Sequence, residues 1–200
     1  MQLRNWQQQL IDELPSIIKK YRRFIIKAPT GAGKTVMASE IIDQFFKGKK
    51  IIVLCHRLVL LEQLDKALSE KHTVRKLRVS DTGTAFEDYD ILLSTTMRAK
   101  AVLGDAIPKA DLIIVAEAHR VSPTGTGYKW IIDDFKEHGK ATALFIGLTA
   151  SPERRTADQR DQLNLAFDAI IDCANIEDLI EEGVLVQPVY RPHFVHDLDL

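Results

Sequence analysis

The feature that most constrains the fold is an eight-residue segment of mostly small residues, Ala28-Pro29-Thr30-Gly31-Ala32-Gly33-Lys34-Thr35, which we call the phosphate loop. It follows a short apolar run at 24–27 and opens a stretch of helical periodicity at 35–46. A strand, a glycine-containing loop and a helix in this order supply backbone N–H groups and a positive helix end, which together bind phosphate. The segment therefore predicts a nucleoside triphosphate site within an α/β domain.

The phosphate loop also assigns roles to individual side chains. Lys34 is expected to reach the β- and γ-phosphates, and Thr35 is expected to offer its hydroxyl to Mg²⁺. The residues expected to contact the nucleotide are Thr30, Gly31, Ala32, Gly33, Lys34 and Thr35. Ala28 stands where the general pattern has glycine, so the match is to the variant with a small residue there. A plain turn is the competing interpretation, but the flanking strand and helix favour ATP and Mg²⁺ as cofactors.

Further apolar runs predict the rest of the sheet. They lie at 24–27, 51–55, 74–79, 91–94, 112–115 and 143–148. These runs are almost continuously apolar rather than alternating, which is typical of strands covered on both faces. Segments with helical periodicity, including 35–46 and 58–68, lie between several of them. The alternation predicts an α/β fold with a mostly parallel sheet and helices on both faces.

An acidic motif follows the apolar run at 112–115, where the sequence continues Ala116-Glu117-Ala118-His119. Enzymes that hydrolyse triphosphates on a phosphate loop need an Asp for Mg²⁺ and a neighbouring Glu that polarises the attacking water. Glu117 fits the catalytic role and, with Thr35, is expected to lie near the metal. Ala116 occupies the position of the Asp and has no oxygen to offer.

With these motifs in this order, the chain resembles the first RecA-like motor domain of a superfamily 2 helicase of the Asp-Glu-Ala-His type, with the leading Asp replaced. The resemblance covers nearly all 200 residues. It implies that Gln7 hydrogen-bonds the adenine edge with help from Arg4, although a solvated helix face is the alternative interpretation of this Gln-rich start. It further implies nucleic-acid contacts by His56, Arg57 and Thr95, and coupling of hydrolysis to movement by His119, Thr149 and Ser151. For His56 and Arg57, capping of a strand end is the alternative interpretation.

The resemblance implies an ATP-dependent helicase or translocase motor that acts on nucleic acid, with DNA favoured over RNA. Residues 1–186 are expected to form the RecA-like domain. Residues 187–200 are expected to form an exit linker toward a second RecA-like domain, which in this family supplies arginine fingers. Because Ala116 replaces the Asp and the second domain is expected to be missing from this form, the domain is expected to bind ATP but to hydrolyse it poorly. The alternative is a catalytically dead nucleotide switch or nucleic-acid clamp.

Composition limits the kind of partner and the compartment. The chain has 27 Lys and Arg against 28 Asp and Glu, so its formal charge is −1 and any nucleic-acid contact must be local. No apolar run reaches the length of a membrane span, and the N-terminus does not read as a secretory signal. Cys55 and Cys173 lie far apart in apolar surroundings, which suits two free thiols in a reducing compartment. We therefore expect a cytoplasmic protein without membrane contact.

Overall fold

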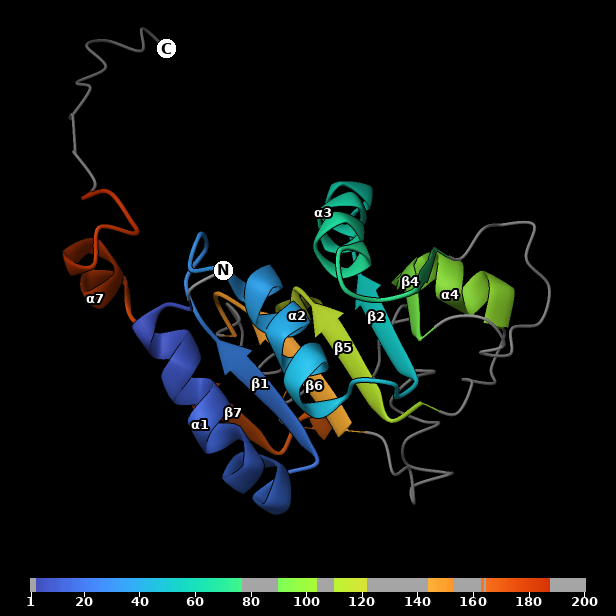
Figure 1. Cartoon of the computed structure of the whole chain (residues 1–200), viewed down its shortest axis with the longest axis horizontal. Coiled ribbons are helices and arrows are strands. Elements are labelled where there is room, and N and C mark those ends of the chain that lie inside the picture. Colours follow the sequence, from blue (N-terminus) through green and yellow to red (C-terminus); the bar gives the residue numbers. More distant parts are fainter. Residues whose placement is uncertain are drawn as a thin grey trace, which may run out of the picture.

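The computed structural model describes residues 3–76, 90–103, 110–121, 144–152, 163 and 165–187. Within these ranges one sheet is formed by seven strands, and every pair of neighbouring strands is parallel (Figure 1). The strands are β1 (Arg23–Lys27), β2 (Ile51–Cys55), β3 (Val74–Lys76), β4 (Ile91–Thr95), β5 (Leu112–Ala116), β6 (Leu144–Thr149) and β7 (Ala169–Asp172). Their order across the sheet is β3-β4-β2-β5-β6-β1-β7.

Helices cover both faces of this sheet. They are α1 (Asn5–Lys20), α2 (Lys34–Phe45), α3 (Leu58–Ser69), α4 (Thr96–Leu103), the short 3-10 helix η1 (Ala118–Arg120) and α7 (Ile176–Glu181). The apolar residues of α1, α2, α3 and α7 join one hydrophobic cluster. Those of α4 and η1 join a second cluster on the opposite face. No helix in the described ranges is long and apolar enough to cross a membrane.

The inner strands are buried because each of their faces meets a helical layer. In β2 all five residues are buried, and successive side chains alternate between the two clusters. Ile51 and Val53 belong to the cluster on the face covered by α3, whereas Ile52 and Leu54 belong to the cluster on the face of α4. This two-sided burial explains why the strand sequences are almost continuously apolar.

The structure confirms the predicted α/β class, and the described strands are all parallel rather than mostly so. Each predicted apolar run contains a strand, although residues 77–79 and 143 lie outside the described residues. Sequence reasoning missed β7, α4 and α7. β7 escaped because it is an edge strand whose residues are only half-buried or exposed, so its apolar signal is short.

Strand order determines which motifs meet. β1 lies between β6 and β7, and β5 is the other neighbour of β6. Since all of these strands are parallel, the loops that follow β1, β5 and β6 leave from the same edge of the sheet, where ligands bind in open α/β folds. The expected domain boundary after residue 186 falls at the end of the described residues, and 188–200 of the expected linker lie outside them.

Candidate nucleotide and nucleic-acid site

The phosphate loop occupies the connection between β1 and α2. The N–H of Ala28 donates to the carbonyl of Thr149 at 3.1 Å, which ties the start of the loop to the end of β6. Gly31 and Gly33 have φ values of 82° and 97°, a left-handed conformation that side chains disfavour. Gly33 is also the N-cap of α2, so the loop runs directly into the positive end of that helix.

Lys34 is held inside the phosphate loop. Its Nζ donates to the carbonyl oxygens of Ala28 and Pro29, each at 2.9 Å. Burial lowers the pKa of Lys34, and the negative charge of Glu117 partly opposes that shift. A half-buried ammonium group placed beside a loop of backbone donors is well suited to a polyanion such as a triphosphate.

The N-cap and first turn of α1 contact the same loop. Arg4 donates through Nη1 to the carbonyls of Gly31, at 3.0 Å, and Ala32. Trp6 donates through Nε1 to Ala32 at 3.3 Å. The sequence predicted Arg4 as an adenine contact but indicated no role for Trp6. The indole N–H of Trp6 finds its acceptor only when the fold places the carbonyl of Ala32 beside it.

Gln7 takes part in the same contact and is almost fully buried. Its Nε2 donates to the carbonyl of Gly33 at 3.1 Å, and its Oε1 accepts from the backbone N–H of Arg4 at 3.0 Å. Only 2% of the residue is exposed. A side-chain amide retains one further donor and one further acceptor site after two such bonds. Adenine recognition by Gln7 stays a prediction, and the structure adds a second role in holding the loop.

Glu117 leaves the end of β5 in an unusual backbone conformation. Its φ of 62° makes it the one non-glycine residue with positive φ among the described residues. Backbone conformations of this kind cost about 1 kcal/mol or more and cluster at functional sites. Its carboxylate is partly exposed and lines a cavity of about 310 Å³ with His56, Arg57 and Arg120.

His119 joins this carboxylate to the end of β6. Its Nδ1 lies 2.9 Å from Oγ1 of Thr149 and 3.2 Å from Oε2 of Glu117. The same Thr149 hydroxyl accepts the backbone N–H of Ser151 at 3.3 Å. The structure thus brings together the three residues predicted to couple hydrolysis to movement, although that role itself stays a prediction.

Donors for Mg²⁺ near the phosphate loop are few. Magnesium prefers oxygen ligands and commonly combines one or two carboxylates with phosphate oxygens and water. Thr35 and Glu117 supply a hydroxyl and a carboxylate, whereas Ala116 ends β5 with a methyl group. In the part of the chain that the structure describes, no three His, Cys, Asp or Glu side chains gather into a metal site. The residues present therefore fit a metal carried mainly by the phosphates of a nucleotide.

The predicted nucleic-acid residues lie farther along the same sheet edge. A second cavity, of about 490 Å³, is shared by His56 and Thr95 and adjoins exposed Leu58 and Met97. The pKa of His56 is lowered by burial first, and then by the positive charges of Arg120 and Arg57. His56 also lines the cavity beside Glu117, whose negative charge partly opposes this lowering of the pKa.

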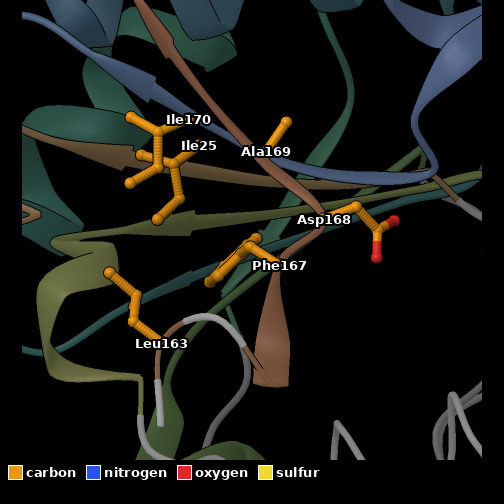
Figure 2. Close-up of a pocket in the computed structure, with 6 residues that line it drawn as sticks. All are labelled: Ile25, Leu163, Phe167, Asp168, Ala169 and Ile170. Carbon is orange, nitrogen blue, oxygen red and sulfur yellow. The ribbon is translucent and has the colours of Figure 1, made fainter. Parts of the chain in front are cut away.

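Another cavity, of about 270 Å³, lies away from every predicted site residue (Figure 2). It is lined by Ile25, Leu163, Phe167, Asp168, Ala169 and Ile170. Figure 2 shows the carboxylate of Asp168 directed away from the apolar side chains, and it pairs with Arg23. None of the predicted site residues is among the described residues that line this cavity, so we do not assign it to the nucleotide.

Comparison with known proteins identifies the family. Residues 1–154 match the model of the family described as type III restriction enzyme, res subunit. The chain belongs to this family. The chain is a first RecA-like ATPase domain of the superfamily 2 helicase type, as the sequence predicted.

A curated relative and two solved structures are similar to the chain. The domain is 29% identical over 198 residues to "Putative ATP-dependent helicase IRC3" of Saccharomyces cerevisiae, covering 92% of this chain and 28% of the relative. The type ISP restriction-modification enzyme LlaGI, solved with a DNA substrate mimic, gives a TM-score of 0.66 at 17% identity over 92% of this chain and 21% of that one. The Sulfolobus solfataricus SWI2/SNF2 ATPase core, solved with double-stranded DNA, gives a TM-score of 0.64 at 17% identity, over 84% of this chain and 36% of that one. These two structures support the fold alone.

Proposed function

We propose that this domain is the ATP-binding part of an ATP-dependent motor that translocates along or unwinds nucleic acid. The observation that carries the proposal is the meeting of three chain segments at one sheet edge. The half-buried ammonium of Lys34 lies within electrostatic reach of Glu117, which in turn contacts His119. Bound ATP and Mg²⁺ would supply the transferable phosphoryl group, while Lys34 orients its oxygens and Glu117 positions water.

The motor needs a second RecA-like domain to complete the ATP site. An arginine finger from such a domain is worth about 10³- to 10⁵-fold in rate. The domain spans 28% of the length of its yeast relative, which leaves room for further domains in proteins of this kind. We propose residues 187–200 as the connection toward it, and we expect the isolated domain to turn over ATP slowly.

Ala116 is proposed to limit hydrolysis further. A methyl group at the end of β5 cannot anchor Mg²⁺, so Glu117 loses the ion that helps position its water. The phosphate loop and Lys34 are unaffected by this change. ATP binding is therefore retained while turnover is lost.

The decisive experiment restores the carboxylate in the full-length protein. Ala116→Asp should raise nucleic-acid-stimulated ATP hydrolysis by orders of magnitude, and Glu117→Gln on that background should abolish it again. The matched control is Ala110→Asp, which places a carboxylate before the opposite end of β5 and should leave hydrolysis unchanged. If Ala116→Asp is as inactive as the parent at saturating ATP and Mg²⁺, the motor proposal fails.

The second candidate function is a nucleotide switch or nucleic-acid clamp that binds ATP without hydrolysing it. Ala116 is the specific observation that favours it, because a methyl group at the end of β5 cannot anchor the Mg²⁺ that hydrolysis needs. Inactive Ala116→Asp protein that still binds ATP would support this second function.

We propose DNA rather than RNA as the nucleic acid. The LlaGI and SWI2/SNF2 structures that share this fold were each solved with DNA, which supports the choice. His56, Arg57 and Thr95 are proposed to contact its phosphates at the sheet edge. Hydrolysis by the Ala116→Asp full-length protein should be stimulated by duplex or single-stranded DNA more than by RNA. Equal stimulation by RNA would contradict this choice.

A further inference from the structure

The segment that follows α7 turns back onto the domain. Gly183 adopts a φ of 69°, which reverses the chain at the end of the helix. The backbone N–H groups of Val184 and Leu185 then both donate to the carbonyl of Leu179, at 2.8 and 2.9 Å. This turn fixes the direction in which the Leu185 side chain leaves the backbone.

Leu185 packs against the phosphate loop. Its Cδ2 would lie 3.1 Å from a Cβ placed on Gly31, so the isobutyl group rests directly on the glycine. Leu185 is half-buried and packs with the main hydrophobic cluster, whereas the next residue, Val186, is 92% exposed. The contact is therefore specific to one of two adjacent apolar side chains.

A polar contact ties the same segment to α1. Asn5 donates through Nδ2 to Oε1 of Glu182 at 2.8 Å. Figure 1 shows α7 beside the amino-terminal end of α1. Since Arg4, the N-cap residue of α1, donates to the carbonyl of Gly31, that glycine is contacted from both the N-terminal and the C-terminal segments.

We propose that Leu185 is a positioning residue for the nucleotide site and acts through Gly31. This inference rests on the proposed function, in which the phosphate loop binds ATP. Gly31 is exposed and its left-handed conformation has no side chain to stabilise it, so outside contacts decide how well it is ordered. Leu185 removes space into which the loop could otherwise move, and Arg4 fixes the carbonyl on the other side.

The contact couples the nucleotide to the chain that follows α7. If Leu185 stabilises the binding conformation of Gly31, then a nucleotide that stabilises Gly31 must stabilise the position of Leu185 by the same free energy. Nucleotide binding would thereby order the segment through which the domain continues.

The first test measures the loop without nucleotide. Hydrogen exchange of the peptide covering residues 30–35 should be faster in Leu185→Ala than in the parent chain. It should be unchanged in Val186→Ala, which shortens the exposed neighbour and serves as the matched control. Leu185→Met retains an apolar contact and should restore slow exchange. Equal exchange of this peptide in the Leu185→Ala and Val186→Ala chains would overturn the inference.

The second test measures nucleotide affinity. Titration with Mg-ADP should show affinity about fivefold weaker for Leu185→Ala and parental affinity for Val186→Ala and Leu185→Met. Mg-ADP should also slow exchange at residues 183–186 in the parent chain. Affinities of Leu185→Ala and Val186→Ala within about twofold of each other would overturn the proposed role. If the parent chain binds no ADP or ATP, the proposed function fails, and the exchange of residues 30–35 still decides whether Leu185 positions the loop.

Discussion

Nδ1 of His119 and Oγ1 of Thr149 lie 2.9 Å apart and connect the segment after β5 to the last residue of β6. Thr149 is fully buried, so its hydroxyl depends on protein partners, and His119 also contacts Glu117. A movement of the Glu117 carboxylate can thus be transmitted through His119 to Thr149 at the end of β6. The carbonyl of Thr149 accepts the N–H of Ala28 at the start of the phosphate loop.

This hydrogen bond should be measurable as an interaction free energy. In a double-mutant cycle of His119→Ala and Thr149→Val, unfolding by denaturant should give a coupling of about 1 kcal/mol. A cycle that pairs His119→Ala with Thr73→Val, an exposed residue just before β3, should be additive. A coupling indistinguishable from zero in the first cycle would show that the contact contributes nothing.

Nucleotide binding should depend on Lys34. Lys34→Ala should abolish measurable binding of ATP and ADP in calorimetry, because its charge-assisted contact with the β- and γ-phosphates has no substitute in the loop. Lys27→Ala is the control, because Lys27, at the end of β1, pairs with Asp172 at the end of β7 and its loss should leave binding intact. Folded Lys34→Ala protein with affinity within about twofold of the parent would rule out the loop as the site.

The preference for adenine should depend on Gln7. Gln7→Ala should reduce the preference for ATP over GTP by about 1 to 2 kcal/mol, because guanine mispairs with the remaining donor and acceptor of the amide. Loss of the hydrogen bond to Gly33 should also lower the affinity for ATP and for GTP by the same factor. Calorimetry with each nucleotide separates this common loss of affinity from the loss of adenine preference. Gln8→Ala, which changes an exposed side chain bonded to Asp12, is the control. Equal affinities of the parent chain for ATP and GTP would refute adenine recognition.

Nucleic acid should bind this domain weakly and through phosphates. The net charge is −1, so only local groups such as Arg57 can attract the backbone. Affinity for a DNA oligonucleotide, followed by fluorescence anisotropy, should fall steeply with salt and show little sequence preference. Arg57→Gln should weaken binding and reduce the salt slope by about one unit. Tight, salt-insensitive and sequence-specific binding would contradict this expectation.

Acid should destabilise the domain partly through His72. Burial is the main cause that lowers the pKa of His72; Lys71 and Lys47 add to the shift, and Asp43 and Asp90 oppose it. Because its folded pKa lies below its unfolded value, the unfolded chain gains a proton first, and stability falls as the pH drops below about 6.5.

His72→Gln isolates that contribution. The variant should lose less unfolding free energy than the parent between about pH 7 and pH 5, as measured by denaturant titration at each pH. The parent and the His72→Gln variant contain the same titrating carboxylates, so the difference between their unfolding free energies reports the contribution of His72. Parallel stability curves over this range would show that His72 makes no such contribution.

The sequence predicted the elements that depend on neighbouring residues. The phosphate loop, the helix that follows it and the apolar strands are set by local spacing and by burial on both faces, and the structure confirms them. The placement of Glu117 at the end of β5 follows from the same local pattern. β7 was missed because an edge strand carries little apolar signal.

Only the tertiary structure decided which partners these motifs take. Trp6 became a donor to the phosphate loop because α1 packs beside β1, and Leu185 came to rest on Gly31 because α7 returns to the start of α1. Neither contact produces a periodic pattern in the sequence. A carbonyl oxygen or a glycine can be contacted by many kinds of side chain, and here the contacting residue comes from a distant part of the chain. Local sequence determines which residues form the phosphate loop, whereas strand order and helix packing determine which side chains hold that loop in place.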